Sequence, residues 1–173
     1  VVVPQTVVVH DGVPSDSTAR NYYVPYRDYI KNVASSEIYS TWPESSITAN
    51  VLAIMSFTLN RVYTEWYRNQ GYDFTITSST AFDHKWIYGR NIFQSISQVV
   101  DEIFDAYLSR PGVRQPILTQ YCDGRQVQCP DWMTIQKEDI SQGETPESLI
   151  LSGFPGLLLD SNTYQYDSRL WYI

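Results

Sequence analysis

The stretch Val33-Ala-Ser-Ser-Glu37-Ile-Tyr-Ser-Thr41-Trp-Pro43-Glu44 decides how the fold of this chain is interpreted. It predicts that Glu37 stands in a short polar loop just ahead of a helix. Thr41 and Glu44 have the spacing of a capping box, and Pro43 suits a first helical turn because its missing N–H leaves no bond unmade. A carboxyl group held at the mouth of a packed helix loses contact with water, which raises its pKa and favours a general acid.

Two strands and a helix are expected before Glu37. Residues 1–9 are mostly β-branched and end at a turn signal, so they predict a strand. Residues 22–24 predict a second short strand, and a helix is expected to begin at Pro25 and to end close to Glu37. The apolar side chains of that helix have the spacing of a single face: Tyr26, Tyr29, Ile30 and Val33.

Two long helices are expected in the middle of the chain. The first begins near Trp42 and runs to Asn69, where Gly71 terminates it, and the second covers residues 90–108. Each carries apolar residues at helical spacing, which indicates a face that packs on a core. The stripe of the first helix is Ile47, Val51, Ile54, Met55, Thr58, Leu59 and Val62. The stripe of the second is Ile92, Ile96, Val99, Val100, Ile103, Phe104 and Tyr107.

The remaining segments are shorter. Residues 73–77 alternate apolar and polar and predict a strand, and residues 78–89 predict a loop. Residues 116–121 are expected to form another strand, followed by a turn over 122–130 and a helix that starts near Thr145. Interspersed helices and short strands predict one α+β domain over residues 1–173, with two long amphipathic helices and several short strands.

The composition limits the classes of function. The 173 residues are 43% hydrophobic and 18% charged, which is typical of a globular domain. The apolar runs are too short for a membrane span, and the net charge of −7 argues against nucleic acid as a partner. The chain begins at Val1 without a signal-peptide pattern, so we expect that its natural N-terminus has been removed.

The stretch around Glu37 resembles the catalytic segment of the stage II sporulation protein D family, whose members are peptidoglycan lytic transglycosylases. In the family pattern Glu-Met-Pro-x-x-x-Pro the first residue is the catalytic glutamate, and this chain reads Glu37-Ile-Tyr-Ser-Thr-Trp-Pro43. The resemblance is best over residues 26–129 and weaker over 130–173. It implies an enzyme that cleaves the β-1,4 bond between N-acetylmuramic acid and N-acetylglucosamine in glycan strands and needs no cofactor.

The resemblance also implies a set of site residues. Glu37 is expected to act alone, first as acid and then as base. Asn50 and Ser56, on the following helix, are candidate substrate contacts that can form hydrogen bonds. Further candidates lie in the 78–89 loop, where aromatic rings suit sugar rings and a carboxylate can fix an amide: Asp83, Trp86 and Tyr88. An exposed turn with scattered aromatic residues is the alternative interpretation of that loop.

Cys122 and Cys129 flank an Asp-Gly pair, where a tight reversal makes a small disulfide loop feasible. The residues alone leave a disulfide and two free thiols equally open, and the resemblance to an extracytoplasmic family favours the disulfide. We expect no metal, because structural zinc needs four ligands and no histidine follows Lys85.

Three functions stay open at this stage. The leading one is a lytic transglycosylase of Gram-positive cell walls, secreted or wall-associated, with peptidoglycan as its partner. A second keeps the fold as an inactive peptidoglycan-binding module, because Met55 stands where the family commonly has Arg and residues 130–136 replace its Ser-Gln-Trp-Gly loop. A third is a structural part of a larger cell-wall or phage-like assembly, in which an acidic, tyrosine-rich surface contacts other proteins.

Overall fold

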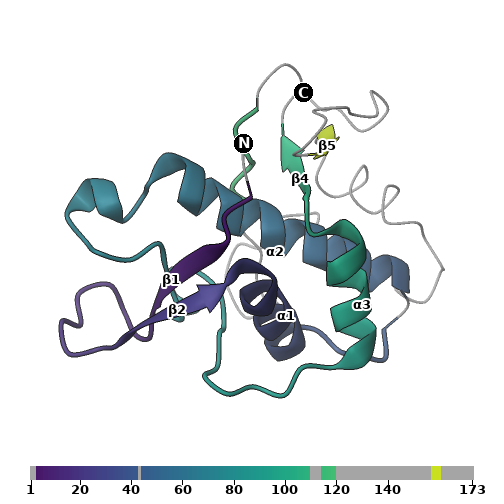
Figure 1. Cartoon of the computed structure of the whole chain (residues 1–173), viewed down its shortest axis with the longest axis horizontal. Coiled ribbons are helices and arrows are strands. Elements are labelled where there is room, and N and C mark those ends of the chain that lie inside the picture. Colours follow the sequence, from purple (N-terminus) through teal and green to yellow (C-terminus); the bar gives the residue numbers. More distant parts are fainter. Residues whose placement is uncertain (1–2, 43, 110–113, 120–156, 161–173) are drawn as a thin grey trace.

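The computed structural model describes residues 3–42, 44–109, 114–119 and 157–160, apart from the side chains of 45, 46 and 157–160. Helices and short strands alternate along the chain, which confirms the α+β class (Figure 1). In chain order the elements are β1 (Thr6–His10), β2 (Asn21–Pro25), α1 (Tyr26–Glu37), α2 (Glu44–Thr64), the 3-10 helix η1 (Arg68–Gln70), β3 (Ile76–Thr77), α3 (Gln94–Ile103), β4 (Ala106–Ser109) and β5 (Leu157–Asp160).

Two small sheets flank the helices. The first has the strand order β2-β1-β3, in which β1 pairs antiparallel with β2 and parallel with β3. The second pairs β4 with β5 in antiparallel register. The three α-helices contact one another and form the centre of the molecule, with the first sheet beside them and the second packed on α2 through β4 (Figure 1).

Helix α1 follows the sequence prediction closely. It begins directly after Pro25, whose φ of −53° already suits a helix entry. The residues expected on its apolar face are all buried: Tyr26, Tyr29, Ile30 and Val33. The helix ends with Glu37 as its last residue, and the N–H of Ile38 still bonds the carbonyl of Ala34. The helix thus ends close to Glu37 as expected, but Glu37 is its last residue and does not lie in the expected loop.

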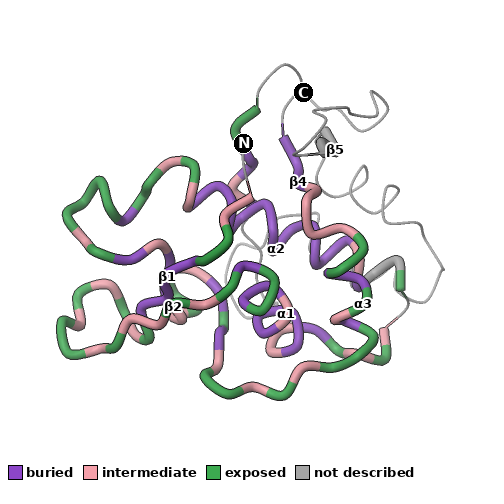
Figure 2. The backbone as a smooth tube through the Cα atoms, in the orientation of Figure 1, coloured by how far each residue is buried: buried purple, intermediate pink, exposed green. Residues whose placement is uncertain are grey.

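Helix α2 is buried around its whole circumference rather than along one stripe. Every residue from Ala49 to Arg61 is buried, because α1, α3, β3 and β4 all pack against this helix (Figure 2). Its hydroxyl groups tolerate burial because they bond carbonyls one turn earlier: Ser56 donates to Leu52 and Thr58 to Ile54. Most residues of the expected stripe are in the core, but the stripe missed Leu52 and Phe57 and the buried polar positions between them.

Both ends of α2 differ from the prediction. The helix begins at Glu44 instead of near Trp42, so Thr41 and Glu44 do not occupy the N-cap and N3 positions of a capping box. It ends at Thr64, because Glu65 adopts the left-handed φ of 50°. Gly71, the expected terminator, closes the short helix η1 with a φ of 91°.

The predicted second long helix is divided into two elements. Helix α3 covers Gln94–Ile103, and residues 106–108, which were expected to be helical, belong to strand β4 instead. The β4 backbone finds partners in β5 and in α2, where the N–H of Leu108 donates to Ser56 Oγ at 2.8 Å. Pro116 forms a single bridge to Ser109 rather than a strand. The expected turn at 122–130 and the helix near Thr145 lie outside the described residues.

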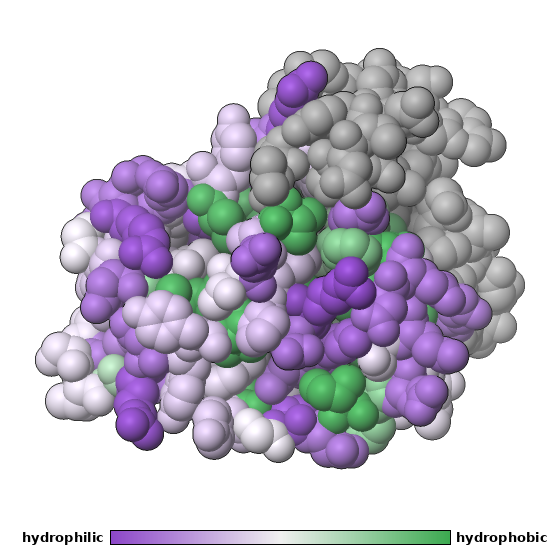
Figure 3. Space-filling view, in the orientation of Figure 1, coloured by the Kyte–Doolittle hydropathy of each residue, from purple (hydrophilic) through white to green (hydrophobic). Residues whose placement is uncertain are grey.

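The described surface is mixed in character. On the face seen in Figure 3, hydrophilic side chains surround small, separate apolar patches. Several of the large exposed apolar side chains are aromatic, among them Tyr23, Tyr39 and Tyr88. In the part of the chain that the structure describes, no helix has the length and apolarity that crossing a membrane requires.

We predict that Ser56→Ala lowers the free energy of unfolding by about 1–3 kcal/mol, because the buried N–H of Leu108 loses its acceptor. Thr64→Ala is the matched control, since the Thr64 hydroxyl bonds the Asn60 carbonyl of its own helix. Urea unfolding of both variants measures the difference. Equal losses in the two variants would contradict a structural link between α2 and β4 through Ser56.

Candidate functional site

Glu37 lies where α1 ends and meets the segment between β3 and α3. Its Oε1 accepts the backbone N–H of Lys85 at 2.7 Å. Its Oε2 is buried and has no hydrogen-bond partner among the described residues. The residue as a whole is only half-buried, so the carboxyl group is covered while other atoms of the side chain reach solvent. One oxygen is thus held by a hydrogen bond, and the other is buried without a partner among the described residues.

The position of Glu37 favours the protonated carboxyl. Burial raises its pKa to about 8, and the N–H and charge of Lys85 offset only part of that effect. The carboxyl also stands at the C-terminal end of α1, where the helix dipole is negative and disfavours a second negative charge. Because Oε1 accepts the Lys85 N–H, the proton belongs on Oε2. At neutral pH Glu37 is therefore a neutral acid with its proton on the unpartnered oxygen.

A two-way amide contact fixes the segment that holds Glu37. Asn32, buried on α1, donates from Nδ2 to the carbonyl of Ile87 at 2.7 Å and accepts the N–H of Ile87 on Oδ1 at 3.0 Å. A side-chain amide in this arrangement pairs with the backbone as a neighbouring strand would. Ile87 is two residues from Lys85, so Asn32 fixes the backbone close to the N–H that bonds Glu37.

Further polar contacts continue along α1 in both directions. Arg90 donates to the carbonyl of Ser35 at 2.7 Å, and the N–H of Phe93 bonds Ser35 Oγ at 3.3 Å. In the other direction, the ring of His84 packs on Phe57, and its Nδ1 lies 3.1 Å from the hydroxyl of Tyr29. Burial, with a smaller effect of the Arg61 charge, lowers the pKa of His84 to about 3, so this histidine is uncharged at neutral pH.

Asp83 belongs to a buried network rather than to the surroundings of Glu37. Its side chain is fully buried, with Oδ1 2.8 Å from Nε of Arg61. Its Oδ2 accepts the Tyr67 hydroxyl at 2.6 Å and both the N–H and the hydroxyl of Thr77. These bonds join α2, β3 and the turn after α2. They leave no part of the carboxylate for a substrate, so we assign Asp83 to the fold.

The two candidates on α2 are also part of the interior. Ser56 is completely buried, and its hydroxyl both donates to Leu52 and accepts from Leu108. Asn50 is buried on the same helix. Met55, which stands where the stage II sporulation protein D family commonly has arginine, is a fully buried core residue. The structure therefore does not bring Ser56 to a surface that a glycan could reach.

Trp86 and Tyr88 follow Lys85 and lie beside strand β2. Tyr88 is 67% exposed, whereas Trp86 is 6% exposed. Both rings contact Tyr22 of β2, with ring centres 4.8 Å apart for Tyr88 and 5.5 Å apart for Trp86. Of the residues expected at the site, Trp86 and Tyr88 thus lie in the segment whose Lys85 N–H bonds Glu37.

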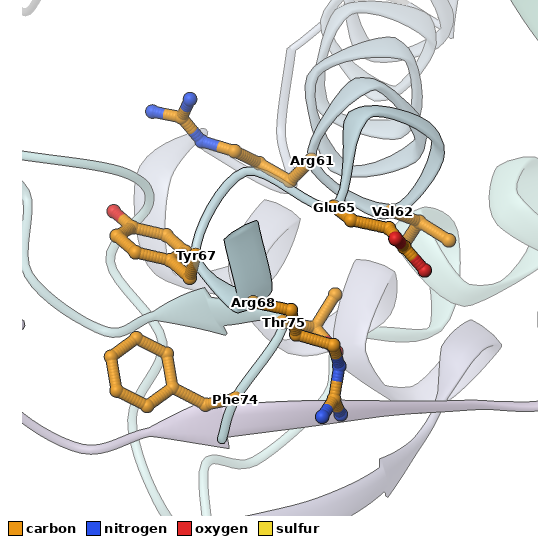
Figure 4. A pocket seen from close by; sticks show the side chains of 7 residues that line it. All are labelled: Arg61, Val62, Glu65, Tyr67, Arg68, Phe74 and Thr75. Carbon is orange, nitrogen blue, oxygen red and sulfur yellow. The ribbon is translucent and has the colours of Figure 1, made fainter. Parts of the chain in front are cut away.

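A shallow hollow of about 130 Å³ lies away from Glu37, at the turn that follows α2 (Figure 4). The polar groups of Arg61 and Tyr67 on its wall already bond Asp83, so they are not available to a ligand. Its lining residues are Arg61, Val62, Glu65, Tyr67, Arg68, Phe74 and Thr75. We assign no function to this hollow.

Three contributors to the site were missed by the sequence analysis: Asn32, the Lys85 backbone and Tyr22. A polar residue on the buried face of an amphipathic helix was the available signal for Asn32, whereas nothing in a sequence points to a single backbone N–H. Within the described ranges, no three His, Cys, Asp or Glu side chains gather as metal ligands would. Cys122 and Cys129, the expected disulfide, lie outside the described residues.

We predict that Asp83→Asn lowers the free energy of unfolding by about 3–5 kcal/mol, because Arg61 would remain buried without a countercharge. The control is Asp101→Asn, which removes a carboxylate from exposed pairs with Arg27 and Lys31 and costs about 1 kcal/mol or less. Equilibrium unfolding in denaturant compares them. Similar losses for both variants would contradict the structural assignment of Asp83.

Glu37→Gln is expected to change how stability depends on pH. The carboxyl titrates near 8 when folded and near its ordinary 4.5 when unfolded, so the folded state binds the proton more tightly. The contribution of Glu37 is fully present below 4.5 and is lost as the pH rises through about 8. The variant has no such loss, so its stability relative to wild type should rise across that range.

Comparing the two proteins separates Glu37 from His84. The lowered pKa of His84 acts in the opposite sense, because its contribution is present above its ordinary 6.5 and lost as the pH falls toward about 3. Both proteins contain His84, so it cancels in the difference between their free energies of unfolding. A difference that stays constant from acid to alkaline pH would mean that Glu37 is an ordinary solvated carboxylate.

No protein-family model matches the chain, and comparison with curated proteins also found no match. The resemblance to the stage II sporulation protein D family over residues 26–129 therefore remains a prediction. The feature of the site that bears on chemistry is a buried carboxyl group with a raised pKa, at the junction of α1 and the 84–90 segment.

Proposed function

We propose that this chain is a cell-wall domain of the stage II sporulation protein D type, which cleaves peptidoglycan glycan strands as a lytic transglycosylase. Glu37 is its acid and base, and its place of action is outside the cytoplasm. The observation that carries the proposal is the state of the Glu37 carboxyl. One oxygen is held by the Lys85 N–H, the other is unpartnered among the described residues, and the pKa is about 8.

A neutral carboxyl suits the first step of this reaction. Glu37 donates its proton to the glycosidic oxygen while the bond from that oxygen to the anomeric carbon of the muramyl sugar breaks. The proton comes from Oε2, because Oε1 accepts the Lys85 N–H. A carboxyl group with an ordinary pKa of 4.5 would carry almost no proton at neutral pH, so burial supplies the reactive form.

The second step uses the carboxylate that the first step leaves. It accepts the proton of the muramyl C6 hydroxyl while the C6 oxygen bonds the anomeric carbon, which closes a 1,6-anhydro ring without water. A single carboxyl group is therefore sufficient, in contrast to ordinary glycoside hydrolysis, where two carboxylates flank the bond. This agrees with the assignment of the nearby Asp83 to the fold, since no second carboxylate is required.

An inactive glycan-binding module is the second candidate, and the covering of Oε2 favours it. That atom has almost no contact with solvent, so a glycosidic oxygen reaches it only when the covering groups move. An enzyme makes such a movement during binding, whereas a module that has lost turnover does not need it. The two candidates share the fold and the ligand and differ in whether bonds are broken.

The decisive experiment is mass spectrometry of soluble products after incubation with purified peptidoglycan. Wild type should release fragments with 1,6-anhydro-muramyl ends, and Glu37→Gln should release at least about 100-fold less, the low end for loss of general acid–base catalysis. Glu102→Gln, an exposed glutamate on α3, is the matched control and should behave as wild type.

Each other outcome excludes part of the proposal. Reducing ends formed by addition of water would mean a hydrolase and a second carboxylate. Sedimentation with peptidoglycan and no products would identify the binding module. Anhydro products that persist at full yield in Glu37→Gln would remove Glu37 from the mechanism.

A further inference from the structure

Three aromatic side chains from two separate segments form one cluster, here called the aromatic platform: Tyr22, Trp86 and Tyr88. Tyr22 comes from β2, and the other two come from the segment that holds Glu37. Their ring centres lie 4.8 Å apart for Tyr22 and Tyr88, 5.5 Å for Tyr22 and Trp86, and 6.2 Å for Trp86 and Tyr88. All three spacings are those of aromatic rings in contact.

The platform has an exposed ring surface and one buried donor without a partner among the described residues. Tyr88 is 67% exposed and Tyr22 is half-buried, so ring surface is available to solvent. Trp86 is 6% exposed, and its Nε1 has no hydrogen-bond partner among the described residues. A buried indole N–H usually finds an acceptor, so this one indicates a place where a ligand supplies it.

The platform is joined to Glu37 through the backbone. Trp86 directly follows Lys85, whose N–H holds the Glu37 carboxyl. The three residues from Lys85 to Tyr88 span at most about 11 Å, so the platform is within a short distance of that N–H. The contacts of Asn32 with Ile87 fix the same stretch on α1. A polymer with one linkage at Glu37 is thus long enough to contact the platform with a neighbouring unit.

We propose that Tyr22, Trp86 and Tyr88 form a binding subsite for one pyranose ring of a β-1,4-linked glycan. The apolar C–H face of the sugar lies on Tyr88 and Tyr22, and a hydroxyl or acetamido oxygen accepts the Trp86 Nε1–H. A nucleic-acid base also stacks on aromatic rings, but the net charge of −7 repels its phosphates. The subsite rests on the proposed function, because glycan is the ligand in both.

The test measures binding without turnover, using Glu37→Gln as the background and a soluble N-acetylglucosamine oligosaccharide as the probe. The readout is the indole N–H signal of Trp86 in NMR spectra, which reports on this subsite. Addition of the probe should shift that signal, and Tyr88→Ala should weaken binding about tenfold, as expected for an aromatic anchor. Tyr23→Ala is the control, because Tyr23 is 76% exposed on the same strand and outside the platform.

Two results would overturn the subsite: an unchanged Trp86 signal at saturating probe, or equal weakening by Tyr88→Ala and Tyr23→Ala. Tyr88 is mostly exposed, so its truncation leaves the fold intact, and a far-ultraviolet circular dichroism spectrum checks this.

Failure of the proposed function would give a different set of results. Wild type would then yield no anhydro products from peptidoglycan, while the probe would still shift the Trp86 indole signal and Tyr88→Ala would still weaken binding of the probe. If wild type released anhydro products but Tyr88→Ala did not change binding of the probe, the proposed activity would stand and the subsite would be excluded.

Discussion

The hydrogen bonds that fasten residues 84–93 to α1 are the constraint on which the site depends. This segment has little regular structure of its own, so its position comes from Asn32, Ser35 and Glu37, each of which meets a backbone group or side chain of the segment. Burial of the Glu37 carboxyl beside this segment raises its pKa, because desolvation is the main cause of that shift and the Lys85 N–H offsets only part of it. Position and protonation of Glu37 thus have one physical origin.

The burial of α2 explains why polar residues near this site serve different purposes. A helix packed on every side must satisfy its polar groups internally, and its hydroxyls do so by bonding carbonyls of the preceding turn. Arg61 has no such local partner and is instead neutralised by Asp83. Asp83 is therefore held by its ion pair with Arg61 of α2, although only His84 separates it from Lys85 in the sequence. Asp83 and Lys85 are thus close in the sequence, but Asp83 stabilises the fold whereas the Lys85 N–H contributes to the site.

Much of the fold could be predicted from the sequence where the signals are local. The apolar spacing of residues 26–33 placed α1 correctly, and the short strand expected at 22–24 lies within β2. The motif around Glu37 directed attention to a carboxyl group that the structure buries. The end of α2 was missed because Glu65 takes a left-handed conformation that glycine usually marks. Strand β4 was taken for helix because its partner lies about 50 residues further along the chain. Ser56 and Asp83 were misjudged because burial from several elements cannot be deduced from a short motif.

The central claim is that Glu37 is a neutral acid at neutral pH because the 84–93 segment covers it. The most direct measurement is a ¹³C NMR titration of the Glu37 side-chain carboxyl, with Glu37→Gln to assign the signal and Asn32→Ala to loosen the segment. We expect a midpoint near 8 in wild type and a shift toward the ordinary 4.5 in Asn32→Ala, as water reaches the carboxyl. A wild-type midpoint near 4.5, or one that Asn32→Ala leaves unchanged, would contradict the account.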